Sequence, residues 1–488
     1  MAWLRNCVRA TGLLGTYGGC IFSLQAAAVS PSPTAWTGRP GTEAARTLQR
    51  LLDTVALGST TTYQHLGLQA GASVQLFYAA NAYHPVWTQD TGWNSAAAAA
   101  LDLLARAPEY GLRREDYAWW HLQSLADSLQ LGTARLRGPL LAGFELRLTD
   151  ALLRYATHVQ RGRLTAATLA PALNEEDAPV VARLRLALNT NTLPGFIRES
   201  QPRGRAYQQL QLAWLAALAA ACPEDSARLL TGESSLFRQV AINLERLRWA
   251  AVADSEYAEV NIPAFHLQLI RHGQVVRTHR VVVGKPEMPT PTLTSRILVF
   301  VTSPAWRVPH SIAVKELLPE IQRDPGFLAD NNYELLDAAN NPVNPWRVRW
   351  RSITPATFRY TIRQTAGRTN ALGKVVFYFP NRHTVFLHDT PARTVFTRAD
   401  RALSHGCVRV ENPLALAAYL LRREGTEASL RPALTGPTRH DKRRFDLSVG
   451  LPVHFQYYTC AGENGRVRSY PDIYGKDTAL LAAFFAQP

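Results

Sequence analysis

The sequence predicts a multidomain α+β protein in which a helical N-terminal part precedes a mainly β part. Three observations lead to this prediction. The chain has 488 residues, which is enough for two or three domains. Apolar residues recur three and four positions apart from about residue 41 to residue 230, and alternate with polar ones from about residue 257 onward. A segment of about 60 residues, 304–363, interrupts the β pattern and is too long for a connector, so we expect an inserted lid subdomain.

Residues 1–28 have the three regions of a secretory signal. Arg5 and Arg9 give a basic start, an apolar run covers residues 12–24, and residues 26–28 are all alanine. The run is shorter than the roughly 20 residues that a membrane-spanning helix requires. We therefore expect cleavage near Ala28 and an exported, periplasmic protein that is soluble or peripherally associated with the wall. The sequence YGGC at 17–20 leaves a lipoprotein signal as the alternative.

Residues 29–250 are expected to form a helical scaffold without a catalytic cluster. In FELRLTDALLRYATHVQRGRL (144–164), we expect the helical pattern to be interrupted at Thr149-Asp150 and at Gly162. In QLQLAWLAALAAACPEDSARLL (209–230), we expect the helix to break at Pro223.

Residues 255–480 are expected to form the β part. AFHLQLIRHGQVVRTHRVVVGK predicts a hairpin that turns at His272-Gly273. KVVFYFPNRHTVFLHD predicts two strands joined at PNR, with His388 at the end of the second strand. Alternation along this strand puts Phe386 and His388 on one face and Leu387 on the other.

After signal cleavage three cysteines remain: Cys222, Cys407 and Cys460. Three is an awkward number for a disulfide framework, so at least one thiol of an exported protein stays free. We interpret Cys222 as a small buried residue on a helix and Cys460 as buried filling of a strand.

Cys407 lies in the sequence SHGCVRV, which predicts a turn followed by a short strand. A cysteine attacks as the thiolate, and its ordinary pKa of about 8.5 means that it needs a neighbouring base or dipole. His388 is the natural base, and Asp389 or its carbonyl could orient the imidazole. Gly406 allows close backbone approach, and the N–H groups around Gly406 and Cys407 could stabilise an oxyanion.

The spacing of these residues resembles the signature of the L,D-transpeptidase (YkuD-domain) family. His388 is followed by fifteen residues and then by Ser404-His405-Gly406-Cys407-Val408. PAWRVPHSI (304–312), YELLD (333–337), NALG (370–373) and DIYGKD (472–477) are similar to its large, scaffold-bearing periplasmic branch. The resemblance covers about 255–480 strongly, and the helical part more loosely.

This resemblance implies a YkuD-like catalytic domain that cuts tetrapeptide stems of peptidoglycan after the third residue, a diamino acid. Terminal D-alanine is released, and the acyl thioester passes to the side-chain amine of another stem in a 3→3 cross-link. Carbapenems are expected to acylate the same cysteine. Carried onto this chain, Cys407 is the nucleophile, His388 is the general acid and base, and Ser404, His405, Gly406, Asp389 and Arg409 shape the site.

Two features depart from the family pattern. Only about 25 residues (221–245) separate the scaffold helix from the catalytic half, which is too short for the helical peptidoglycan-binding module of many large relatives. Arg409 stands where small members usually have Asn, as it does in the large branch.

The expected partners are donor and acceptor stem peptides, together with other enzymes of wall synthesis. The formal net charge of +15 favours anionic surroundings, and export favours the wall or a membrane surface over nucleic acid. No cofactor is expected.

Three alternatives stay open. His388, His405 and Cys407 could supply three zinc ligands. The fold could also serve a wall-binding protein without activity. A thiol hydrolase would share the thioester but give the acyl group to water, acting on peptidoglycan stems or on wall-anchored protein.

Overall fold

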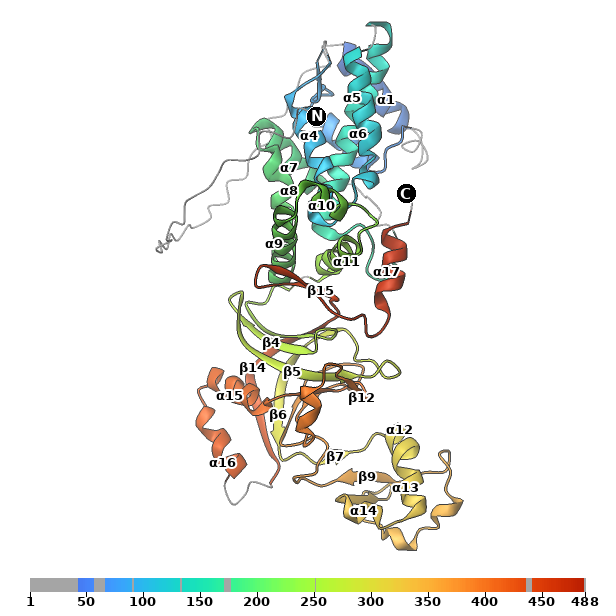
Figure 1. Ribbon diagram of the computed structural model, residues 1–488, viewed down its shortest axis with the longest axis vertical. Coiled ribbons are helices and arrows are strands. Elements are labelled where there is room, and N and C mark those ends of the chain that lie inside the picture. Colours follow the sequence, from blue (N-terminus) through green and yellow to red (C-terminus); the bar gives the residue numbers. More distant parts are fainter. Residues whose placement is uncertain are drawn as a thin grey trace.

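The structure is a computed structural model that describes residues 43–56, 66–89, 92–131, 134–170, 177–250, 252–435 and 441–486. The signal at 1–28 lies outside these residues. The molecule is elongated, with a helical part at one end, a β-sheet in the middle and the inserted segment at the far end (Figure 1). Within the described residues, no helix combines the length and apolar character needed to cross a bilayer.

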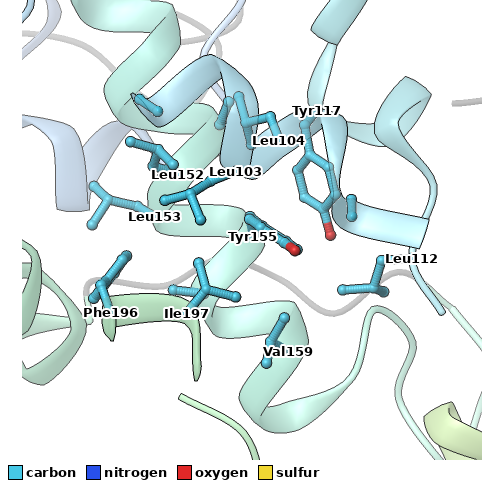
Figure 2. Packing of buried hydrophobic residues seen from close by; sticks show 14 of the residues in the cluster. Leu103, Leu104, Leu112, Tyr117, Leu152, Leu153, Tyr155, Val159, Phe196 and Ile197 are labelled. Carbon is cyan, nitrogen blue, oxygen red and sulfur yellow. The ribbon is translucent and has the colours of Figure 1, made fainter. Parts of the chain in front are cut away.

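The helical character predicted for this half of the chain is confirmed, and its longest helix is α6 (Ala134–Arg161). Its elements are α1 (Glu43–Ala56), α3 (Gly71–Ala79), β1 (Thr88–Gln89), β2 (Gly92–Trp93), α4 (Ser95–Ala105), α5 (Trp119–Leu131), α6 (Ala134–Arg161), α7 (Ala178–Asn189), α8 (Leu193–Glu199), α9 (Arg205–Ala220), α10 (Pro223–Leu229) and α11 (Ser235–Trp249). Leu152, Tyr155 and Val159 of α6 are buried against neighbouring helices (Figure 2).

The prediction that the helix is interrupted at Thr149-Asp150 is wrong, because α6 continues through both residues. Asp150 is buried in mid-helix, where its carboxylate accepts from the amides of Gln69 and Ala70 and from the guanidinium of Arg154. A residue type that often interrupts helices here joins two segments of the scaffold. The predicted break at Pro223 is confirmed: α9 ends at Ala220 and α10 begins at Pro223.

The β part is a sheet that closes on itself. Its strands are β3 (Glu256–Asn261), β4 (His266–Arg271), β5 (Gln274–Gly284), β6 (Leu293–Thr302), β10 (Val375–Tyr378), β11 (Leu387–His388), β12 (Ala402–Ser404), β13 (Val408–Val410) and β14 (Arg443–Gln456). Their order is β12-β5-β13-β11-β10-β6-β14-β3-β4, and β4 also pairs with β5. The sheet thus encloses an apolar core, which includes Leu387 and Val408. The predicted hairpin is confirmed, with positive φ at His272 and Gly273.

The C-terminal segment returns from the barrel to the helices. After α15 (Pro413–Arg423) and α16 (Leu430–Thr435), the chain forms the hairpin β15 (Cys460–Glu463) and β16 (Arg466–Ser469) and then α17 (Lys476–Phe484). Cys460 and Phe484 are buried in the core of the helical part. Thr459 exchanges two 2.9 Å hydrogen bonds with Asn243 of α11. The helical part and the barrel are therefore joined by packing as well as by the chain.

The segment inserted between β6 and β10 has a small core of its own. It contains β7 (Trp306–Arg307), α12 (His310–Ile312), a π-helical turn (Ala313–Leu317), α13 (Leu318–Arg323), α14 (Phe327–Asp330), β8 (Tyr333–Leu336) and β9 (Thr361–Gln364). The strands form a sheet in the order β7-β9-β8. Ile321, Trp350 and Ile362 are buried between the sheet and the helices. We propose that this core marks the segment as a separate subdomain, which we call the insertion.

Candidate active site

A cavity of about 660 Å³ lies between the insertion and the barrel. It brings together five of the seven residues proposed from the sequence, namely His388, Ser404, His405, Cys407 and Arg409. The other two, Asp389 and Gly406, are buried and are not among the lining residues.

The register of two parallel strands places Cys407 and His388 on the same side of the sheet. In β11 and β13, Leu387 pairs with Val408 and His388 pairs with Arg409. Leu387 and Val408 point into the barrel core. The residues next to them, His388 in β11 and Cys407 directly before β13, therefore point outward, toward the cavity. The alternation predicted from the sequence is confirmed, since the rings of Phe386 and His388 pack 5.5 Å apart, centroid to centroid.

His388 is a buried imidazole in a fixed orientation. Its Nδ1 lies 2.6 Å from the backbone carbonyl of Asp389. A carbonyl can only accept, so Nδ1 donates and Nε2 remains as the proton acceptor of the neutral ring. Burial and the charge of Arg409 lower the pKa of His388 to about 3, against the opposing effect of the Asp389 carbonyl. The imidazole is therefore neutral at ordinary pH and can act as a base.

Cys407 is protonated in the resting site. Burial raises the pKa of its thiol to about 11, although the Phe386 backbone and the charge of Arg409 act in the opposite direction. The thiol lies 4.0 Å from the carbonyl oxygen of Thr384, which can accept a weak hydrogen bond from it. The site thus rests as a neutral thiol beside a neutral imidazole rather than as a thiolate–imidazolium pair.

Ser404 and Gly406 shape the turn that presents Cys407, and we call residues 404–407 the nucleophile loop, after the role that the sequence predicts for Cys407. The Ser404 hydroxyl donates to the Cys407 carbonyl at 2.6 Å and accepts from the Gly406 amide at 3.1 Å. Gly406 has φ of +108°, a conformation that disfavours a side chain. Because Ser404 engages the Gly406 amide, the Cys407 amide is the better candidate for an oxyanion donor; no acceptor for it occurs among the described residues.

Two residues outside the predicted set hold this loop from behind. The hydroxyl of buried Thr290 donates to the Gly406 carbonyl at 2.8 Å. The Thr290 amide donates to the hydroxyl of Tyr474, which donates to the Gly284 carbonyl at 2.6 Å. Tyr474 belongs to DIYGKD (472–477), which was noted for its similarity to the family, but the similarity did not indicate that Tyr474 supports this loop. Thr290 lies between Pro289 and Pro291 and carries no signal in the sequence.

Asp389 acts on the site through its backbone rather than by contact between its carboxylate and His388. The carboxylate accepts from the Lys374 amide at 2.8 Å and lies 2.8 Å from the guanidinium of Arg393. These contacts fix the position of the Asp389 carbonyl that orients the His388 ring.

Arg409 places a positive charge beside both Cys407 and His388. Burial lowers the pKa of its guanidinium, and no carboxylate among the described residues pairs with it. It lines the cavity, so its charge is available to an anionic group of a bound molecule.

His405 contacts the insertion rather than its own loop. Its Nε2 lies 2.5 Å from Oε1 of Glu316, a residue of the π-helical turn that also lines the cavity. The two residues are 89 positions apart, so no local pattern indicates this pair. Sequence reasoning therefore missed Glu316 as a site residue.

The other cysteines lie elsewhere, and all three are free thiols. Cys460 is buried as predicted. The prediction for Cys222 is wrong: it is exposed, and its sulfur caps α10 by accepting from the Asp225 amide at 3.4 Å. Across the part of the chain that the structure describes, no three His, Cys, Asp or Glu side chains are grouped as metal ligands would be.

Comparison with known proteins gives two family matches along the chain. Residues 255–439 match the family described as L,D-transpeptidase catalytic domain, YkuD. Residues 72–213 match the family described as Scaffold domain. A Haemophilus influenzae protein assigned as an L,D-transpeptidase is 32% identical over 420 residues, which cover 83% of this chain and 78% of that protein.

Solved structures give a weaker likeness. An L,D-transpeptidase from Mycobacterium smegmatis is 15% identical and covers 41% of this chain and 58% of its own, with a TM-score of 0.19. The LD transpeptidase LdtMt1 in complex with imipenem is 16% identical over 42% of this chain and 59% of its own, also with a TM-score of 0.19. Scores of this size carry no information about function.

Proposed function

This chain belongs to the L,D-transpeptidase family, and we propose that it forms 3→3 cross-links between peptidoglycan stems through a thioester on Cys407. The observation that carries the proposal is the register of β11 and β13. It puts the thiol of Cys407 and the oriented imidazole of His388 on one side of the sheet, at one cavity.

The first half-reaction is the attack of Cys407 on the carbonyl of the third residue of a tetrapeptide stem. Since both groups rest neutral, Nε2 of His388 takes the thiol proton as Sγ attacks. The Cys407 amide donates to the oxyanion of the tetrahedral intermediate. His388 then gives its proton to the leaving amine, and D-alanine departs.

The second half-reaction transfers the acyl group to the amine of another stem. His388 again serves as base, and Cys407 leaves as the thiol. Water competes for the same thioester, so a covered cavity favours cross-linking. The insertion covers the cavity from the side opposite the barrel, and this supports a transferase.

A thiol hydrolase is the alternative within the same chemistry. It would use Cys407 and His388 in the same way and would differ only in the acceptor. Glu316 of the insertion lies at the cavity beside His405, which favours an acceptor held by the protein over water.

We further propose that the enzyme is exported to the periplasm and acts on the wall there, with stem peptides as donor and acceptor. The secretory signal predicted at residues 1–28 and the net charge of +15 support this location. Association with other wall-synthesis enzymes stays a prediction.

The test is incubation of the purified protein with tetrapeptide stems, followed by mass spectrometry of the products. We expect 3→3 dimers and free D-alanine from the native chain. Cys407→Ala should fold normally and form neither thioester nor dimer. Dimer formation by Cys407→Ala would refute the assignment of the nucleophile, and hydrolysed tripeptide as the sole product of the native chain would favour the hydrolase.

A further inference from the structure

We propose that Glu316 of the insertion, held by His405 of the nucleophile loop, forms the subsite that binds the ammonium group of the acceptor stem. The inference rests on the proposed function, because it names the part of the cavity that selects the second substrate.

Glu316 is the acidic member of an otherwise cationic and neutral cavity wall. Of the described residues that line the cavity, only Glu316 carries a carboxylate, whereas Arg307 and Arg409 carry guanidinium groups. A stem brings carboxylates as well as an amine, so a cavity with both signs of charge can orient it. An ammonium group would be attracted to Glu316 and repelled by the two arginines.

The carboxylate of Glu316 is fixed on one side and open on the other. His405 Nε2 lies 2.5 Å from Oε1, and within the described residues no donor is bonded to the second oxygen. The Glu316 side chain is 46% exposed although it lines the cavity. One oxygen is therefore available to a ligand while the other is held by the nucleophile loop.

The backbone at Glu316 also distinguishes this position. Residues 313–317 form a π-helical turn, a rare conformation that often occurs at functional sites. Ala313, Val314 and Leu317 of this turn are buried in the core of the insertion. Glu316 is thus carried by a packed element, and its bond to His405 ties that element to the loop that bears Cys407.

The subsite accounts for the order of bond changes in the second half-reaction. The ammonium group binds at Glu316 and loses one proton to solvent. The amine nitrogen then forms the new C–N bond as the bond between the acyl carbon and Sγ breaks. The remaining extra proton passes through His388 to the departing sulfur, which regenerates the Cys407 thiol.

The experiment compares two nucleophiles that compete for the same thioester in the full chain. A tetrapeptide stem is the donor, a second stem with a diamino acid is the cationic acceptor, and hydroxylamine is a small acceptor that is uncharged at neutral pH. Dimer and hydroxamate are both measured by mass spectrometry. Glu316→Gln removes the charge but keeps an oxygen that can accept from His405. Glu320→Gln is the matched control, because Glu320 is also in the insertion, pairs with Arg323 and does not line the cavity.

We expect Glu316→Gln to lower the ratio of dimer to hydroxamate about tenfold, the size of one lost charge-assisted hydrogen bond. Glu320→Gln should leave the ratio unchanged. If dimer and hydroxamate fall together in Glu316→Gln, the residue serves the donor or the fold, and the inference is wrong. An unchanged ratio also overturns it. If the native chain forms neither product while its thiol remains reactive, the proposed function fails instead.

Discussion

Gly373 lies directly against Asp389, and the site depends on this close approach. A Cβ atom at Gly373 would fall 2.5 Å from Cβ and Cγ of Asp389. Gly373 also has φ of +61°, in the left-handed region. It ends the NALG turn, in which Asn370 is buried and the Leu372 amide donates to its side chain at 2.8 Å. The turn therefore fixes Asp389 and, through the Asp389 carbonyl, the ring of His388.

Gly373→Ala should reduce both stability and acylation. The left-handed backbone alone costs roughly 1–2 kcal/mol for alanine, and displacement of Asp389 adds to it. Since His388 would lose its fixed orientation, we expect imipenem acylation at temperatures where the variant is folded to slow by at least about tenfold. Chemical denaturation and mass spectrometry of the acyl-enzyme measure the two effects. Gly367→Ala is the control, because no atom lies within 4 Å of its added Cβ and its φ is ordinary. Equal acylation rates in the two variants would show that Gly373 has no part in the site.

The neutral resting pair predicts an unusual pH dependence of thiol reactivity. A pKa of about 11 for Cys407 means that the thiolate fraction rises with pH throughout the ordinary range. Alkylation of Cys407 by iodoacetamide should therefore accelerate about tenfold per pH unit from pH 7 to pH 10. Protonation of His388, with its pKa of about 3, should produce no step near pH 6 to 7. A plateau that begins near neutral pH would instead indicate a thiolate–imidazolium pair.

Arg409 provides a second check on the same electrostatics. Its charge lowers the pKa of both Cys407 and His388. The uncharged variant Arg409→Met should raise the pKa of both groups, so alkylation of Cys407 at a fixed pH should slow. Arg382→Met is the matched control, because Arg382 is an exposed arginine next to His383 that does not line the cavity.

The sequence predicted the parts of the site that local patterns determine. Alternation along residues 385–388 placed His388 opposite Leu387, because a strand has a fixed period of two. The reversal at His272-Gly273 followed from turn chemistry. The pairing of His388 with Cys407 is contained in neither pattern; it was proposed from the chemistry that a cysteine nucleophile requires, and the family resemblance supported it.

The errors and omissions involve contacts between distant segments. Asp150 was expected to punctuate a helix, but its carboxylate binds the amides of Gln69 and Ala70, about 80 residues earlier in the chain. Cys222 follows an apolar helix, but that helix ends two residues before it, at Ala220. The bond between His405 and Glu316 depends on the packing of the insertion against the barrel. Local sequence carries no information about such partners, since tertiary packing selects them.

The positions of Cys222 and Cys460 predict that neither thiol takes part in catalysis. Cys222 is an exposed helix cap, and Cys460 is buried in the core of the helical part. Cys222→Ser should keep full activity and stability, because a hydroxyl is a good cap. Cys460→Ala should keep activity at temperatures where it is folded, with a loss of about 1 kcal/mol in the free energy of unfolding. Activity is measured as dimer formation, and stability by denaturant titration. Lost activity together with a Cys222–Cys460 disulfide in the native protein would contradict this prediction.

Removal of the insertion tests what determines whether the acyl group of the proposed thioester is transferred to an amine or to water. Its two ends lie side by side, because Trp306 pairs with Gln364 and Arg307 with Arg363 in β7 and β9. Residues 304–363 can therefore be replaced by a short Gly/Ser linker without stretching the barrel. The contacts that hold Cys407 and His388 come from Ser404, Thr290 and Asp389, which all remain.

Removal of the insertion should leave acylation by imipenem largely intact and change the fate of the acyl group. The cavity wall that carries Glu316 would be lost and water would reach the thioester, so hydrolysed tripeptide should rise and dimer should fall. Both products come from the same acyl-enzyme, so one mass-spectrometric assay measures their ratio. Trp346→Ala is the control, because Trp346 is an exposed residue of the insertion that does not line the cavity. Loss of imipenem acylation would mean that the insertion builds the pocket of the nucleophile itself. An unchanged ratio of dimer to tripeptide would mean that the barrel alone selects the acceptor.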